Sequence, residues 1–176
     1  MKITDRSLWV PFFLFILVGM KLLMVCLGNI CRSPLAEGVM RKKIKDNELH
    51  AEVDSAGTSN YHTGEYPDPR ATACAKNHGI NISKLKARQF TVKDFDNFDH
   101  IFVMDTSNLF DVNSLARNAA DKKKVELIMN AMYPDSNISV PDPYYGGDEG
   151  FEKVVIMLDN ACESIALGIS LNERKR

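Results

Sequence analysis

The chain has 176 residues, of which 45% are hydrophobic and 26% are charged, and its formal net charge is -1. This length and composition fit one globular domain with a single substantial core. A nearly neutral chain lacks the long-range positive field that concentrates proteins on polyanions. We therefore expect no nucleic-acid partner and no binding to an acidic membrane surface.

The four cysteines are Cys26, Cys31, Cys74 and Cys162. Four cysteines in a chain of this length do not make a disulfide framework, so we expect a reducing, cytoplasmic location. Zinc ligands usually come as closely spaced pairs, but Cys26 and Cys31 have no second pair nearby and the four histidines are scattered. We expect no metal.

Residues 1–19 form an apolar extension, with the run LWVPFFLFILVG at its end. The run lacks a small-x-small cleavage pattern, and Lys21 interrupts it before it reaches a comfortable membrane-spanning length. We interpret Met20 as the working start and 20–176 as the domain. A signal peptide or membrane anchor is the alternative, and only that alternative would give the protein a membrane partner.

From Lys21 onward, short aliphatic runs alternate with segments of helical periodicity, which is typical of βαβ units around a parallel sheet. Strands are predicted at 22–25, 51–55, 100–104 and 125–129. These runs are short and mostly apolar, as buried parallel strands are. We therefore predict an α/β fold, a three-layer sandwich with a central four-stranded parallel sheet.

Three helices have clear sequence signals. Ser33 and Pro34 provide a cap and a first-turn proline for one helix, and Asp68 and Pro69 repeat that device for a second helix that Gly79 ends. The last helix has an apolar stripe in steps of three or four residues. The stripe consists of Phe151, Val154, Val155, Leu158, Cys162, Ile165 and Ile169. The long irregular stretches 57–68 and 130–150 should wall the site at the carboxyl ends of the strands.

The segment 26–33 reads Cys-Leu-Gly-Asn-Ile-Cys-Arg-Ser and lies between the first strand and the first helix. A tight loop at a helix start directs several backbone N–H groups toward one point and suits a tetrahedral oxyanion. Arg32 can offer a planar fork to two phosphate oxygens, and the same positive field favours Cys26 as a thiolate nucleophile. Ser33 can cap the helix and donate to that thiolate, and Gly28 should permit a backbone angle that a side chain would forbid.

The segment VCLGNICRSPLAEGV, residues 25–39, resembles the signature of low-molecular-weight protein tyrosine phosphatases. Further stretches that match in the family's order are 53–58, 77–80, 103–105 and 142–146, and the resemblance extends from Met20 to about Leu171. It implies a flavodoxin-like, doubly wound topology. It also implies an enzyme that hydrolyses phosphotyrosine and aryl phosphates through a phosphocysteine, without a cofactor. The expected partner is a tyrosine-phosphorylated protein, with a tyrosine kinase as one candidate.

The resemblance assigns roles to individual residues. Asp142, in Asp-Pro-Tyr-Tyr, becomes the general acid beside Cys26 and Arg32, although an aspartate between prolines is by itself more often a turn former. The remaining expected site residues fall into three groups. The phosphate-binding loop comprises Leu27, Gly28, Asn29, Ile30, Cys31 and Ser33; Ser55 and His78 support it together with Asn29; and Tyr61, Tyr144, Tyr145 and Leu27 form the pocket wall.

Several alternatives and regulatory features stay open at this point. A reversible Cys26–Cys31 disulfide would switch the activity off under peroxide, and Tyr144 and Tyr145 are possible phosphorylation sites. Arsenate reductases share the fold and the Cys-x5-Arg loop but need a further cysteine pair as a relay. A cysteine phosphocarrier subunit of sugar transport would need a durable phosphocysteine, and a catalytically dead phosphotyrosine-binding module would lack the nucleophile or the acid.

Overall fold

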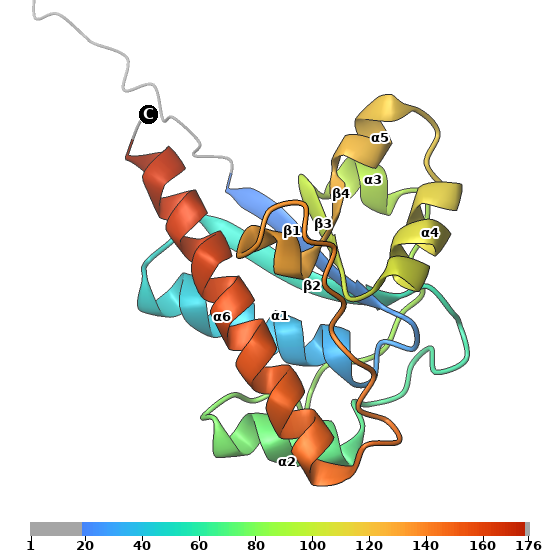
Figure 1. Cartoon of the computed structure of the whole chain (residues 1–176), viewed down its shortest axis with the longest axis vertical. Helices are drawn as coiled ribbons and strands as arrows, with labels where there is room; N and C mark the ends of the chain where they lie inside the picture. The colour runs from blue at the N-terminus through green and yellow to red at the C-terminus, as the bar shows by residue number, and fades with distance from the viewer. Residues whose placement is uncertain (1–18, 175–176) are drawn as a thin grey trace, which may run out of the picture.

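The computed structural model describes residues 19–174 and contains a four-stranded sheet whose strands are all parallel. The strands are β1 (Met20–Cys26), β2 (Ala51–Gly57), β3 (His100–Val103) and β4 (Val125–Leu127), in the order β2-β1-β3-β4. Helices pack on the sheet, as Figure 1 shows. The predicted α/β fold with a four-stranded parallel sheet is confirmed.

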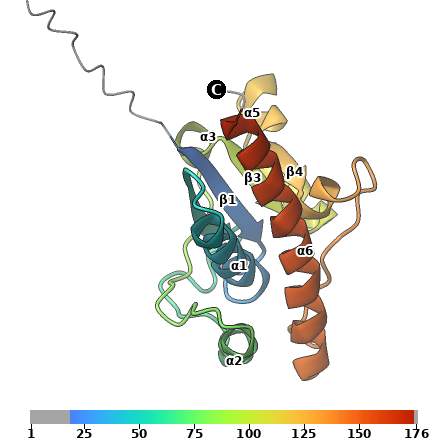
Figure 2. The same cartoon turned by 90° about the vertical axis from the view of Figure 1, so that its left-hand side faces the viewer.

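Six α-helices and one 3-10 helix connect and cover the strands of this part of the chain. They are α1 (Arg32–Asp46), α2 (Pro69–Asn77), α3 (Asp94–Asn97), α4 (Thr106–Ser114), α5 (Ala119–Lys123), η1 (Ile128–Ala131) and α6 (Gly147–Glu173). In both views α1 and α6 lie side by side along the sheet (Figures 1 and 2). The arrangement is the expected three-layer sandwich.

Alternation along the strands builds two separate cores, because successive side chains of a strand point to opposite faces of the sheet. In β1, Leu22 and Met24 face the core under α1 and α6, whereas Leu23 and Val25 face the core under α3 and α4. All four side chains are fully buried. Burial on both faces explains why β1 reads as a continuous apolar run.

The strand order determines where a ligand can reach the sheet. The chain leaves β1 toward β2 on one side and crosses to β3 on the other side, so the order reverses at β1. In doubly wound sheets, ligands bind at the carboxyl ends of the strands beside such a reversal. Cys26 is the last residue of β1 and therefore lies at that point.

Helix α6 begins right after the 130–146 stretch and carries the predicted apolar stripe. Every residue of that stripe is buried. The helix is long and apolar enough to resemble a membrane span by length and composition, but its buried face packs on α1, α2 and η1. We therefore interpret α6 as a core helix of the domain.

The bounds of the predicted strands need adjustment. The predicted strand 125–129 ends at Leu127, because the chain turns into η1 at Ile128. The short helices α3 to α5 gave no distinct periodic signal in the sequence. The interpretation of residues 1–19 lies outside the described residues apart from Gly19.

Gly57 ends β2 directly against the loop that follows Cys26. A Cβ added at Gly57 would lie 2.7 Å from the Leu27 carbonyl oxygen and 3.1 Å from the Asn29 amide nitrogen. Both are backbone atoms, so the loop would have to move. We expect Gly57→Ala to lower the free energy of unfolding by about 1–3 kcal/mol, measured by urea denaturation.

The matched control for this prediction is Gly168→Ala in α6, where an added Cβ meets nothing within 4 Å. That substitution should raise the free energy of unfolding by up to about 1 kcal/mol, because alanine favours the helix. Equal effects of the two substitutions would contradict the steric argument for Gly57.

Candidate functional site

The loop between β1 and α1 wraps around the Cys26 sulfur. The Asn29 amide nitrogen lies 3.3 Å from Cys26 Sγ, and Ser33 Oγ lies 3.0 Å from it. The first turn of α1 follows immediately, with Arg32 as its first residue. One backbone N–H group and the start of a helix therefore lie at this sulfur, an arrangement that fits the predicted anion-binding loop.

Asn29 holds the loop in shape with a left-handed backbone angle, φ 55°. Asparagine tolerates this region better than most residues do. Gly28, for which we expected an unusual angle, has no positive φ, so that prediction was wrong. Its small size matters instead, because a Cβ at Gly28 would lie 3.0 Å from Cδ2 of His62.

The Asn29 side chain braces the loop from behind. Its Nδ2 donates to Ser33 Oγ and to Ser55 Oγ, both at 2.9 Å, and its Oδ1 accepts from the Arg88 amide at 2.9 Å. Asn29 thereby joins α1, β2 and the segment after α2. The structure brings together the predicted residues Asn29, Ser33 and Ser55.

This network has a fixed direction, because both N–H bonds of the Asn29 amide point at serine oxygens. Each serine must then use its own hydrogen elsewhere. Ser55 donates to Glu37 Oε2, a buried carboxylate that sequence reasoning missed. Ser33 is left with Cys26 Sγ and the Ala56 carbonyl oxygen, at 3.3 Å, as acceptors. A thiolate at Cys26 would take that hydrogen bond.

Glu37 anchors the far end of the network. Burial raises the pKa of Glu37, against the opposing effects of the Ser55 hydrogen bond and the Arg41 charge. Arg41 Nη2 lies 2.5 Å from Glu37 Oε1 as the ion-pair partner. A buried charge needs such partners, and the Ser55 hydrogen bond and the Arg41 charge offset part of the cost of burying Glu37.

The Arg32 guanidinium enters the site from the end of the loop opposite to Cys26. Its side chain is only 4% exposed. Nη1 donates to Asp105 Oδ2 at 2.5 Å and to the Val140 carbonyl oxygen at 3.2 Å, and Nη2 donates to Asp142 Oδ2 at 2.7 Å. Arg32 thus connects the loop to two carboxylates from distant parts of the sequence.

Charges around Arg32 stabilise its cationic form. Burial acts to lower the pKa of Arg32, but the negative charges at Cys26, Asp105 and Asp142 outweigh burial and raise it. Asp105 follows β3 and caps α4 by accepting from the Asn108 amide at 2.8 Å. Asp105 is the second carboxylate partner of Arg32, and no role was assigned to it from the sequence. The signal for it was its place in the matching stretch 103–105.

A cavity of about 300 Å³ opens in front of the sulfur. Its lining comprises Cys26, Leu27, Gly28, Ile30, Cys31, Arg32, His62, Asp142, Tyr144 and Tyr145. A wider hollow of about 920 Å³ lies at the other end of β1, around Met20 and His50, but no cysteine is among the described residues that border it. Of these two cavities, the smaller one is the one whose described lining combines a cysteine with a cation and an acid.

The predicted pocket wall is partly corrected. Tyr144 and Tyr145 line the cavity, whereas Tyr61, 81% exposed, lies outside the lining. His62, which the sequence did not predict, lines the cavity where Tyr61 was expected. The Nδ1 atom of His62 bonds Glu65 Oε2 at 2.8 Å. The side chain after Tyr61 faces the cavity because the chain turns here at residues 61–64.

Asp142 and the tyrosines belong to a segment that α2 supports. The Tyr144 amide donates to Asp142 Oδ1 at 3.0 Å, and Arg70 Nη1 donates to the Tyr144 carbonyl oxygen at 3.0 Å. The Arg70 guanidinium also lies 5.2 Å from the centre of the Tyr144 ring. Asp142 remains 44% exposed, so its carboxylate faces both Arg32 and solvent.

Two further expectations were wrong. His78 does not brace the loop; it is the residue that ends α2, and its Nε2 bonds Glu152 Oε1 at 2.8 Å. The Asn29 side-chain oxygen accepts a hydrogen bond from the Arg88 amide, and not from His78. Ser33 does not cap α1 either, because Cys31 is the capping residue and the Ser33 hydroxyl turns to Cys26.

The other cysteines differ from Cys26 in their surroundings. Burial raises the pKa of Cys31, which lines the cavity, to about 12, and burial with a hydrogen bond to Glu152 raises the pKa of Cys74 to about 11. Cys162 is fully buried, and burial raises its pKa as well. Neither Cys74 nor Cys162 borders the cavity, so among the residues that the structure describes no further cysteine pair lies there as a relay.

Comparison with known proteins gives consistent similarities. The family model described as low molecular weight phosphotyrosine protein phosphatase matches residues 21–176. A putative low molecular weight protein-tyrosine-phosphatase from Synechocystis is 46% identical over 150 residues, covering 83% of this chain and 94% of that protein. The Homo sapiens low molecular weight phosphotyrosine protein phosphatase is 45% identical over 145 residues, covering 81% and 90%. A crystal structure of an Entamoeba histolytica protein tyrosine phosphatase aligns with TM-score 0.80 and 41% identity, covering 90% of this chain and 100% of that one.

The geometry of Arg32 predicts how the loop binds a simple anion. Arg32→Lys keeps the charge but removes the planar fork, which costs at least one charge-assisted hydrogen bond worth about 1.5–3 kcal/mol. We expect the Kd for inorganic phosphate, measured by titration calorimetry, to rise about 10- to 100-fold.

Arg117→Lys is the matched control, because Arg117 also pairs with two aspartates, Asp96 and Asp121. It lies away from the cavity lining, so phosphate affinity should not change. An Arg32→Lys protein that binds phosphate as tightly as the Arg117→Lys protein would contradict the role given to the guanidinium.

Proposed function

This chain belongs to the low molecular weight phosphotyrosine protein phosphatase family, and from that premise we propose that it hydrolyses phosphotyrosine through a phosphocysteine on Cys26. One observation carries the proposal. The Cys26 sulfur, the Arg32 guanidinium and the Asp142 carboxylate converge on one cavity from three parts of the chain. That set supplies a nucleophile, an anion-binding group and a proton donor.

In the first step, Cys26 attacks phosphorus while the ester oxygen leaves. The loop amides and Arg32 bind the equatorial phosphoryl oxygens and stabilise their charge. A phosphate that binds the Arg32 fork competes with Asp142 for Nη2, while Asp105 and the Val140 carbonyl keep Nη1 in place. The displaced Asp142 carboxylate takes up a proton from solvent, and the resulting carboxylic acid lies beside the leaving oxygen and protonates it.

In the second step, water attacks the phosphocysteine. Asp142, now ionised, accepts a proton from that water, and phosphate departs as the S–P bond breaks. The departing sulfur regains its charge, and the Ser33 hydroxyl, at 3.0 Å, can donate to it. Because Asn29 fixes the direction of the network, this hydrogen bond is ready before the bond breaks.

The cavity wall supports a substrate with an aromatic ring. Tyr144, Tyr145 and Leu27 border the entrance and present apolar surface on which the ring of phosphotyrosine can pack. We propose that the substrates are tyrosine-phosphorylated proteins, a tyrosine kinase among the candidates. The four free cysteines fit a reducing compartment, so we propose a cytoplasmic enzyme.

The alternative functions make different demands on the same residues. An arsenate reductase needs a further cysteine pair as a relay, but Cys74 bonds Glu152 and Cys162 lies in the core. A phosphocarrier needs a phosphocysteine that water cannot reach. The exposed Asp142 carboxylate, beside the sulfur, favours hydrolysis.

The role of Asp142 predicts a dependence on the leaving group. Asp142→Ala should slow hydrolysis of phenyl phosphate about 100- to 10,000-fold, because the phenolate then leaves without a proton. Hydrolysis of 4-nitrophenyl phosphate should fall much less, because its leaving group is stable as an anion. Steady-state kinetics on both esters measures the difference.

Asp111→Ala in α4 is the control, since this residue is outside the cavity lining. It should leave the ratio of the two rates unchanged. An Asp142→Ala enzyme that slows both esters by the same factor would remove Asp142 from the role of proton donor.

A further inference from the structure

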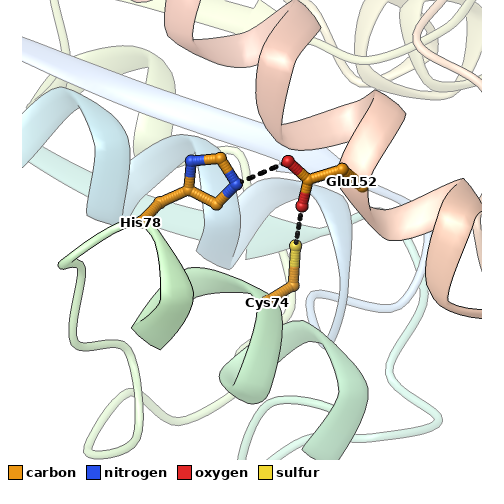
Figure 3. A group of neighbouring side chains, drawn as sticks. All are labelled: Cys74, His78 and Glu152. Atoms are coloured by element: carbon orange, nitrogen blue, oxygen red, sulfur yellow. Dashed lines mark hydrogen bonds and ion pairs between the residues drawn. The ribbon is translucent and has the colours of Figure 1, made fainter.

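A second group of reactive side chains lies between α2 and α6, outside the phosphate cavity. Cys74 and His78 project from α2 toward Glu152 on α6, as Figure 3 shows. Their ligand atoms, one from each residue, all lie within 4.8 Å of one another. The proposed phosphatase mechanism uses none of the three.

The spacing of these atoms is close to that of a metal site. Cys74 Sγ lies 3.6 Å from Glu152 Oε2, and His78 Nε2 lies 2.8 Å from Glu152 Oε1. In a tetrahedral zinc site with ordinary bond lengths, neighbouring ligand atoms are roughly 3.4–3.6 Å apart. A small outward shift of the half-exposed Glu152 side chain would therefore admit an ion.

The secondary structure holds two of the ligands in register. Cys74 and His78 are four residues apart at the end of α2, so both side chains lie on one face of the helix. Helical zinc motifs with two ligands four residues apart use the same spacing. Glu152 faces them from the second turn of α6, so the site joins two helices.

Burial and charge also suit a cation. Cys74 is buried, whereas the His78 and Glu152 side chains are 34% and 49% exposed, which leaves a coordination position open to water. Asp148, one turn before Glu152, is close enough for its charge to act on Cys74. The negative potential of two carboxylates would attract a divalent ion.

We propose that Cys74, His78 and Glu152 form a Zn²⁺ site, with water as the fourth ligand. A thiolate with an imidazole and one carboxylate favours zinc over the harder ions Mg²⁺ and Ca²⁺. When Zn²⁺ binds, the Cys74 thiol releases its proton to solvent as the sulfur–zinc bond forms. His78 binds through the Nε2 lone pair and keeps its proton on Nδ1, and Glu152 binds as a carboxylate.

The simpler interpretation is that the three side chains form only a hydrogen-bonded tie between helices. Both interpretations use the same residues, but they differ in what Glu152→Gln does. An amide keeps the size of the side chain and can still hydrogen-bond His78, so a mere tie would survive. A zinc site would lose one of its three protein ligands, and the metal affinity would fall.

Zinc at this place would stabilise the region around the cavity. The start of α2 holds Arg70, which bonds the Tyr144 carbonyl, and α6 begins directly after that segment. An ion that joins α2 to α6 would therefore restrain the segment that carries Asp142. Because an ion that binds only the folded state raises the unfolding temperature, Zn²⁺ should raise Tm.

Cobalt(II) replaces zinc in such sites and reports on sulfur ligation through a thiolate-to-metal charge-transfer band. We would titrate Co²⁺ into untagged Cys26→Ser/Cys31→Ser protein, in which Cys74 and the core residue Cys162 are the remaining cysteines. The expected result is a charge-transfer band that saturates at one Co²⁺ per chain and disappears when one equivalent of Zn²⁺ is added. The same amount of Zn²⁺ should raise Tm.

Three further substitutions in that protein complete the test. Cys74→Ser should abolish the charge-transfer band. Glu152→Gln should weaken Co²⁺ binding at least tenfold but leave Tm in metal-free buffer unchanged. Glu149→Gln, an exposed carboxylate on the same helix, should change neither. Absence of the band in the starting protein, or a band that persists in Cys74→Ser, would overturn the proposal. Loss of phosphatase activity plays no part in this test, so the two proposals fail independently.

Discussion

The side-chain amide of Asn29 sets the direction of the hydrogen bonds around the nucleophile. An amide has two donor hydrogens on one nitrogen, and here both are committed to serine oxygens. The Ser55 hydrogen therefore goes to Glu37, and the Ser33 hydroxyl is free to donate to the Cys26 sulfur. A buried polar network needs an acceptor for each donor, and the buried Glu37 carboxylate supplies the acceptor for Ser55.

A second constraint is the competition for Arg32. Its buried guanidinium must stay in place to receive a phosphate, yet it must also release one of its two carboxylate partners. The environments of these partners differ, because Asp105 is 23% exposed and caps α4, whereas Asp142 is 44% exposed. In the proposed mechanism the more exposed carboxylate, Asp142, is the one that moves, and it donates a proton to the leaving oxygen after taking that proton up from solvent.

Sequence patterns predicted the parts of this structure that depend on local chemistry. The strand β1 with its double-sided burial, the proline-led start of α2 and the apolar stripe of α6 all follow from residue spacing. We could predict that Cys26, Arg32 and Asp142 converge only from the family resemblance, because Asp142 is 110 residues away from Arg32 in the sequence.

The missed features depend on tertiary contacts that spacing does not encode. Glu37 reads as an ordinary helix glutamate until β2 covers it, and Asp105 is a typical helix cap that also meets Arg32. His78 was assigned to the loop because it lies in a matching stretch, but the fold turns it toward Glu152, 74 residues later. The proposed metal site had no signal in the sequence, since Cys74 and His78 lack a third ligand nearby, and the expectation of no metal stays a prediction.

In the proposed mechanism, Cys26 carries the phosphoryl group during turnover. The most direct measurement is mass spectrometry of acid-quenched Asp142→Ala enzyme during hydrolysis of 4-nitrophenyl phosphate, because loss of Asp142 slows attack by water on the intermediate. The account predicts one added phosphoryl group on the peptide that contains Cys26, and no phosphoryl group or turnover in the protein that also has Cys26→Ser. A phosphoryl group on another residue, or turnover without the Cys26 thiol, would contradict it.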